Sequence, residues 1–96
     1  MVRFSVSAKK FLKKRGVATV VLRFVEFEAA DTLGVAKDVA VTFERPADVK
    51  AFHRDLVEGI EVFVDRKLKV DDEVVIKRQG FWKFSSLYAD GVRVPI

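Results

Sequence analysis

The sequence predicts a mainly β fold: a small, β-sandwich-like domain with one N-terminal helix and one short second helical turn. Three observations support this. Apolar and polar residues alternate in several short segments, β-branched and aromatic residues dominate the longest segment, and isolated Gly or Pro residues separate the segments. A chain of 96 residues, half of them apolar, is expected to form a single domain over residues 1–96 around one core.

The N-terminal part predicts a strand, a basic helix and a long strand. Alternation of apolar residues indicates a half-buried strand at residues 2–6. Ser7 is expected to cap a helix over residues 8–15, and Gly16 to end it. Residues 18–28 form the strongest predicted strand. Its middle is apolar on both faces, so it should lie centrally in a sheet.

The middle of the chain leaves two interpretations open. After a loop at residues 29–34 and a strand at 35–44, the apolar spacing of residues 47–59 fits a helical stripe. The same residues fit one helical turn at 48–52 followed by a hairpin that turns at Glu58 and Gly59, which we favour. The remaining predicted elements are a turn at 70–72, a strand at 73–78, extended chain at 81–87, a turn at Asp90 and Gly91, and a last strand at 92–96.

The residue types present exclude several kinds of chemistry. Without cysteine, the chain alone cannot form disulfides, thiolate nucleophiles, zinc ribbons or cysteine-ligated iron–sulfur clusters. It has no Gly-rich phosphate loop and no Ser nucleophile motif. His53 is the only histidine; although it lies near Asp55, we expect it at the surface or in a turn. We therefore expect no enzyme activity, no catalytic residue and no cofactor.

Acidic clusters give only a weak indication of metal binding. Glu26 and Glu28 share one strand face, and Asp71, Asp72 and Glu73 form an acidic run that we expect in an exposed turn. Neither has the spacing of a calcium loop, so no metal site is predicted. The chain has no apolar run of 18 residues, and we expect a cytoplasmic protein with no membrane contact. Dense charge and the absence of Asn are typical of thermophiles.

Basic residues are concentrated near the N-terminus. Residues 1–23 hold seven Lys or Arg and no acidic residue, whereas the rest of the chain holds eleven basic and fourteen acidic residues. Such asymmetry is typical of a contact for nucleic acid, anionic lipid or an acidic partner. The simpler interpretation, which we favour, is a solvated helix face beside an acidic hairpin. The cations of the predicted helix are Lys9, Lys10, Lys13, Lys14 and Arg15.

An aromatic stretch, GFWKF at residues 80–84, is the second candidate contact. Trp82 and Phe84 alternate with Phe81 and Lys83, so one aromatic face must meet the core. If the other face is exposed, nucleic-acid bases can stack on its rings while Lys77, Arg78 and Lys83 hold the phosphates. The simpler interpretation, which we favour, is that these rings fill the core or seal a subunit interface.

The order of these elements resembles that of the HesB-like proteins, which have the A-type iron–sulfur scaffold fold. The matching features are the basic helix, the long strand, the Pro-Ala-Asp stretch at 46–48, GIEVFV at 59–64, Gly80-Phe81 and the Gly91 turn. The closest likeness is to a short subgroup with a Cys-Cys or selenocysteine motif. The resemblance implies that this pair would lie at residues 28–34, which here read EAADTLG, and longer members end in Cys-Gly-Cys, which this chain lacks.

Two functional hypotheses follow. The first is a non-catalytic scaffold or protein-interaction domain, a cysteine-free relative of the HesB-like proteins that forms a homo-oligomer or binds a protein partner through β-edges or the aromatic face. The alternative is a small basic nucleic-acid-binding module. The expected contact residues are Lys9, Lys10, Lys13, Lys14, Arg15, Trp82, Lys83 and Phe84.

Overall fold

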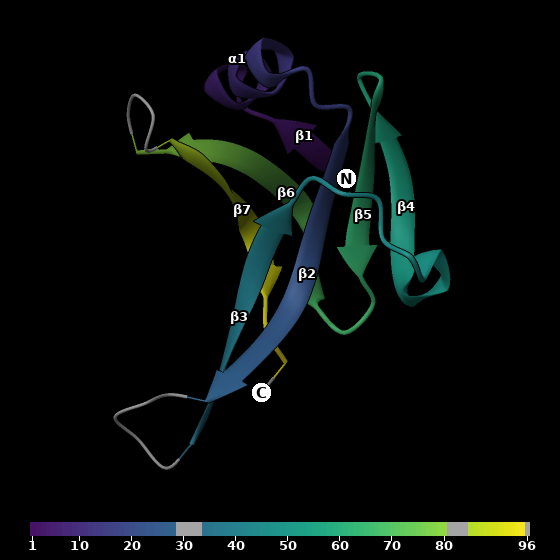
Figure 1. The fold of residues 1–96 in the computed structure, drawn as a ribbon, viewed down its shortest axis with the longest axis vertical. Helices are drawn as coiled ribbons and strands as arrows, with labels where there is room; N and C mark the ends of the chain where they lie inside the picture. Colours follow the sequence, from purple (N-terminus) through teal and green to yellow (C-terminus); the bar gives the residue numbers. More distant parts are fainter. Residues whose placement is uncertain (29–33, 81–84, 96) are drawn as a thin grey trace.

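The computed structural model describes residues 1–28, 34–80 and 85–95, and it shows a mainly β chain with one α-helix and one 3-10 turn (Figure 1). This confirms the predicted fold class. Among the described residues, no helix is both long and apolar enough to cross a membrane. The elements in chain order are β1 Val2–Phe4, α1 Val6–Arg15, β2 Thr19–Glu28, β3 Val35–Thr42, η1 Val49–Ala51, β4 Phe52–Val57, β5 Ile60–Asp65, β6 Lys69–Gln79 and β7 Ser86–Arg93.

The strands form two sheets that pack against each other. One has the order β3-β2-β5-β4 and the other the order β1-β6-β7. Two of the pairings, β2 with β5 and β1 with β6, are parallel and join strands far apart in the sequence. The other pairings are antiparallel. The inner faces of both sheets supply the main core, and α1 lies over one end of it (Figure 1).

β2 is central, as its apolar middle predicts. Val20, Val21 and Leu22 are all fully buried, so both faces of the strand are covered. Val20 and Leu22 belong to the core between the sheets, whereas Val21 packs on the outer face with Phe52 and Phe63. Two arginines cover this outer cluster: the guanidinium of Arg23 lies 5.3 Å from the centre of the Phe52 ring, and that of Arg45 lies 5.7 Å from the Phe63 ring.

The region after β3 follows the favoured interpretation. The turn η1 is followed by the hairpin β4–β5, whose two turn residues both have positive φ, 51° at Glu58 and 81° at Gly59. Two successive positive φ angles match the right-handed twist of the flanking strands. The alternative helical stripe is wrong, because Phe52 and Leu56 lie in β4.

The start of α1 differs from the prediction. The helix begins at Val6, and its N-cap is Ser5, not Ser7; the Ala8 amide donates to the Ser5 hydroxyl at 3.2 Å. Ser5 has the extended φ and ψ of an N-cap, and its hydroxyl reaches the free amide three residues on. Gly16 ends the helix as predicted.

The C-terminal turns are a second correction. The predicted turn at 70–72 is wrong, because β6 runs unbroken through it. The predicted turn at Asp90 and Gly91 and the separate last strand are also wrong, because β7 continues to Arg93. The pairing jumps instead, from Val75 opposite Asp90 to Val70 opposite Val92. The turn-forming residues therefore build an irregularity within a long hairpin, which increases its local twist.

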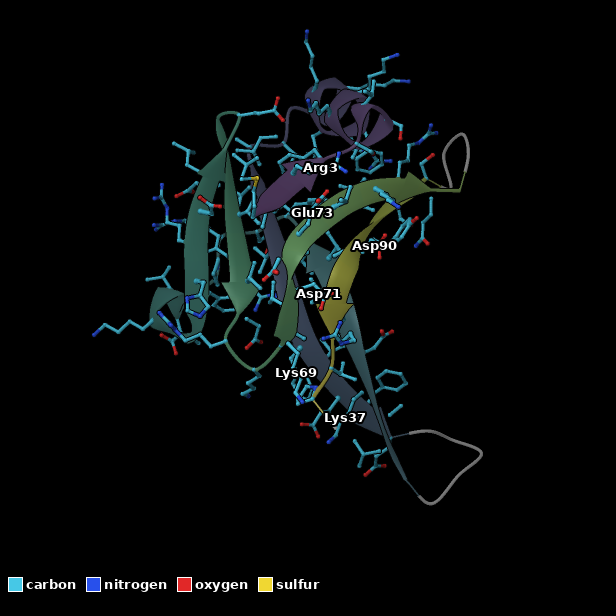
Figure 2. All side chains as sticks on the ribbon, turned by 180° about the vertical axis from the view of Figure 1, so that it is seen from behind. Arg3, Lys37, Lys69, Asp71, Glu73 and Asp90 are labelled. Atoms are coloured by element: carbon cyan, nitrogen blue, oxygen red, sulfur yellow. The ribbon has the colours of Figure 1, made fainter. Side chains whose placement is uncertain are left out.

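The acidic run lies at this irregularity and is held by cations, not placed in an exposed turn. Asp71 pairs with Arg93 and Glu73 pairs with Arg3, each at 2.5 Å (Figure 2). The Asp72 carbonyl accepts a hydrogen bond from the N-terminal ammonium group at 2.7 Å. These contacts join β1, β6 and β7 on the outside of the three-stranded sheet.

Gly91 lets the backbone of β7 approach that of β6 closely at the irregularity, and we expect its replacement to destabilise the fold. Its φ is 94°, and a Cβ there would collide with the Glu73 carbonyl oxygen, whereas a Cβ on Gly59 would meet nothing within 4 Å. We expect Gly59→Ala to lower the free energy of unfolding by about 1–2 kcal/mol, from backbone strain alone. Gly91→Ala should lower it by about 3 kcal/mol or more, from strain and overpacking. Urea denaturation measures both variants, and equal losses would contradict the bulge geometry.

Candidate functional site

The position of α1 creates the candidate site. In the parallel pair β1–β6, Phe4 lies opposite Ile76, and the next amide, that of Ser5, donates to the Ile76 carbonyl at 2.9 Å. The helix therefore starts beside the C-terminal end of β6. Its apolar side, which includes Ala8 and Leu12, is buried against the core. The neighbouring side of the helix overhangs the end of the β6–β7 hairpin.

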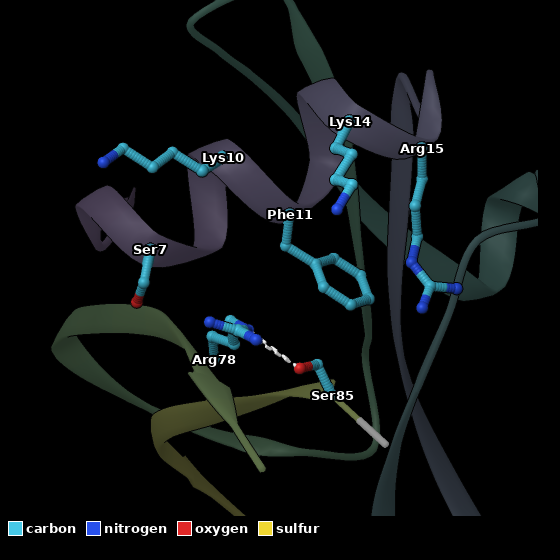
Figure 3. Close-up of a pocket in the computed structure, with 7 residues that line it drawn as sticks. All are labelled: Ser7, Lys10, Phe11, Lys14, Arg15, Arg78 and Ser85. Carbon is cyan, nitrogen blue, oxygen red and sulfur yellow. Dashed lines mark hydrogen bonds between the residues drawn. The ribbon is translucent and has the colours of Figure 1, made fainter. Parts of the chain in front are cut away.

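The opposite wall comes from the inner face of that hairpin. Val74 and Ile76 are buried in the core, so alternation places Arg78 on the same face, where the core ends. Ser85 is likewise on the inner face, two residues before buried Leu87. The Arg78 Nε and Nη2 atoms donate to the Ser85 hydroxyl at 3.0 and 2.5 Å (Figure 3). This contact holds the guanidinium beneath the helix.

Between these walls lies a groove with a cavity of about 580 Å³ (Figure 3). We call it the basic groove, because four of its described lining residues are cationic and none is acidic. The described lining residues are Ser7, Lys10, Phe11, Lys14, Arg15, Arg78 and Ser85.

The helix side of the basic groove follows helical periodicity. Ser7, Lys10, Phe11 and Lys14 recur every three or four residues and so share one stripe. Phe11 forms the apolar floor and is 8% exposed. The Arg15 guanidinium lies 4.4 Å from the centre of the Phe11 ring, close enough for a cation–π contact.

The structure divides the predicted contact residues. Lys10, Lys14 and Arg15 line the groove. Lys9 points elsewhere and pairs with Glu58 in the β4–β5 turn at 2.9 Å, and Lys13 is exposed on the helix without lining the groove. Trp82, Lys83 and Phe84 lie outside the described residues.

The sequence places Arg78 among the cations beside the aromatic stretch, but it does not indicate that Arg78 meets the helix cations, and Ser85 was not a predicted contact residue. The local signal for the inner face was the position of Arg78 in strand alternation, two residues after Ile76. Its neighbour Lys77 points to the other face of β6 and donates to Asp90 at 3.1 Å, which raises the pKa of Lys77. Lys77 is thus already paired and does not belong to the groove.

The other candidate residues, His53 and the acidic clusters, are not among the described residues that line the basic groove. Arg66 contacts His53, with its Nη1 atom 3.2 Å from Nδ1. Glu26 and Glu28 do share one face, but Glu26 lies opposite Lys37 in the β2–β3 pair. Within the described ranges, no three His, Asp or Glu side chains are placed to hold a metal ion. His53 and Asp55 line a second cavity of about 450 Å³ with Val2, Arg54, Val64, Leu68 and Val70.

Comparison with protein families identifies the chain. The model of the CC/Se motif containing family matches residues 1–92, nearly the whole chain, and the chain belongs to this family. This match confirms the predicted resemblance to proteins with a Cys-Cys or selenocysteine motif. The chain itself contains no cysteine. No curated protein matches the sequence.

Because the N-cap fixes where α1 begins, its loss should destabilise the wall of the groove. We expect Ser5→Ala to lower the free energy of unfolding by about 1 kcal/mol, since the Ala8 amide loses its acceptor. Ser7→Ala is the matched control and should change it by less than about 0.5 kcal/mol, as surface substitutions usually do. Thermal or urea unfolding distinguishes the two. If Ser7→Ala caused the larger loss of stability, Ser7 would be the N-cap, as the sequence predicts.

Proposed function

We propose that the chain is a non-catalytic scaffold or protein-interaction domain, a cysteine-free relative of the HesB-like proteins. In this proposal it binds a negatively charged partner through the basic groove, in the cytoplasm. The single observation that carries the proposal is the convergence of Lys10, Lys14, Arg15 and Arg78 on one groove. The order of basic helix, long strand and 59–64 strand supports the relation to HesB-like proteins.

The charge of the groove supports an anionic partner on physical grounds. Cations gathered in a concave surface with an apolar floor focus the electrostatic potential, because the low-dielectric wall excludes water. The described ion pair of the helix, between Lys9 and Glu58, involves no residue that lines the groove and so leaves the charge of the groove in place. A partner that brings negative charge therefore gains both association rate and orientation.

The lining chemistry favours binding over catalysis. General acid–base catalysis near neutral pH needs a side chain that changes protonation there, most often His, Asp or Glu. The described lining residues supply only Lys, Arg, Ser and Phe. In the Arg78–Ser85 pair the Ser85 hydroxyl accepts two hydrogen bonds from the Arg78 guanidinium.

Exposed apolar residues support self-association as part of the scaffold role. Phe27 and Val35 are 54% and 57% exposed and lie at the end of the β2–β3 hairpin, far from α1 (Figure 1). Leu56, on edge strand β4, is 59% exposed. Exposed apolar surface and an open strand edge are features of sheets that pair with a second chain.

Nucleic-acid binding is the second candidate function. The observation that favours it is that the Phe11 ring and the Arg15 guanidinium line the same groove as three further cations, which are Lys10, Lys14 and Arg78. Such surfaces let bases stack while cations hold phosphates. Size-exclusion chromatography with light scattering separates the two candidates. An oligomer that persists at high salt and ignores a short oligonucleotide supports the scaffold; a monomer that co-elutes with it only at low salt supports nucleic-acid binding.

The groove itself is tested with a labelled polyglutamate peptide and a short single-stranded oligonucleotide as anionic probes. We expect at least one probe to bind at low salt and to weaken as salt rises. Lys14→Glu should reduce that affinity by about tenfold or more, because it places a like charge in the contact. Fluorescence anisotropy measures the effect.

Lys13→Glu is the matched control, with the same charge change on the same helix but outside the groove. It should reduce affinity by about threefold or less, through long-range charge alone. Equal losses in the two variants would show that the probes respond to the helix as a whole, and the groove would not be the contact surface. If neither probe binds, the proposed function is wrong.

A further inference from the structure

The basic groove has features that specify its ligand further than negative charge alone. Lys14 points from α1 toward Arg78 on β6, whereas Lys10, one turn earlier, lines the wall with its ammonium group extended away from both (Figure 3). Two cations on facing walls repel each other, and the arrangement gains most from an anion that carries more than one negative charge. A phosphate group carries close to two at neutral pH, whereas a carboxylate carries one.

The Arg78 guanidinium is held in a fixed orientation that suits a phosphate group. Two of its five N–H donors are directed to Ser85, which fixes the plane of the fork without consuming all its donors. A guanidinium held in this way binds phosphate oxygens with little loss of side-chain entropy. Lys10 and Lys14 add flexible point charges, and the Ser7 hydroxyl adds a neutral donor at the same wall.

The groove is larger than a phosphate ion requires. Its volume of about 580 Å³ is that of a pocket for a small organic ligand. The floor is the Phe11 ring, covered on one side by the Arg15 guanidinium at 4.4 Å. Because the Phe11 ring is 8% exposed, the flat surface open to a ligand is the outer side of the Arg15 guanidinium, which the ring supports from below.

We propose that the basic groove binds a nucleotide unit, with its phosphate between Lys14 and Arg78 and its base on the Arg15 guanidinium that covers the Phe11 ring. This inference rests on the proposed function, since it names the anionic group that the same groove recognises. A free nucleotide offers a phosphate monoester with close to two negative charges, whereas a nucleotide within a strand offers a diester with one. Both offer the same base, and the experiment separates these two sources.

Isothermal titration calorimetry at low salt compares adenosine monophosphate, adenosine, inorganic phosphate and a short oligonucleotide. We expect the nucleotide to bind at least about tenfold more tightly than either the nucleoside or inorganic phosphate, because only it uses both parts of the groove. Comparable affinity for the nucleoside would overturn the phosphate contact, and comparable affinity for inorganic phosphate would overturn the base contact. Tighter binding of the oligonucleotide than of the nucleotide identifies a strand as the source, and the reverse identifies a free nucleotide.

Arg78→Gln should weaken nucleotide binding by about tenfold or more, whereas Lys13→Gln should change it by less than about twofold. Because Arg78 is exposed, the variant should fold, and circular dichroism checks this. Lys14→Gln provides an independent test with no effect on the Arg78–Ser85 contact. If nucleotide, phosphate and oligonucleotide all fail to bind while polyglutamate binds, the nucleotide inference is wrong and the proposed function stands. If polyglutamate fails as well, both are wrong.

Discussion

Burial of the β2–β5 pair on both faces is the constraint on which the rest of the structure depends. These adjacent parallel strands place five fully buried side chains at the centre of the fold: Val20, Val21, Leu22, Val62 and Phe63. The three-stranded sheet covers the inner face, while β4 supplies Phe52 to the outer face. The inner core still needs a cover at its end, which α1 provides through Ala8, Phe11 and Leu12. At about 25 cal/mol per Å² of apolar surface, this burial is the main term that fixes the helix in place.

The basic groove is a consequence of that cover. A helix buries only one stripe, so the adjacent stripe of α1 overhangs the sheet edge with its lysines. On the other wall, the alternation of β6 continues past Ile76, its last buried residue. Arg78 therefore lies on the inner face of the sheet at a place where the core has ended. The groove is therefore the open end of the sandwich, apolar at its floor and cationic at its rim. The same two periodicities that build the core also place the charges.

Much of the fold is predictable because its signals are local. The apolar middle of β2, the Glu58-Gly59 turn and the Gly16 helix end each depend on a few adjacent residues. The parallel pairings join residues that are 42 positions apart in β2–β5 and 72 positions apart in β1–β6, and no local pattern encodes such pairings. The same limit explains the groove: the helix cations were visible, but Arg78 meets them only through the β1–β6 register. Gly91 was mistaken for a turn because positive φ serves bulges as well as turns.

The concentration of basic residues near the N-terminus divides, in the structure, into cations with local partners and a remainder on the helix. Arg3 is paired with Glu73, Lys9 with Glu58, and Arg23 lies over Phe52, so the basic excess that remains at the N-terminal helix is directed largely to the groove.

The Cys-Cys pair of the resembling subgroup was expected at residues 28–34, of which 29–33 lie outside the described residues. The flanking ends, Glu28 and Val35, lie at the opposite end of the molecule from α1 (Figure 1). If the family's cysteine pair lies where the resemblance implies, it and the basic groove belong to different residues and different strand ends. The proposed role of the groove therefore uses no residue of the motif that names the family.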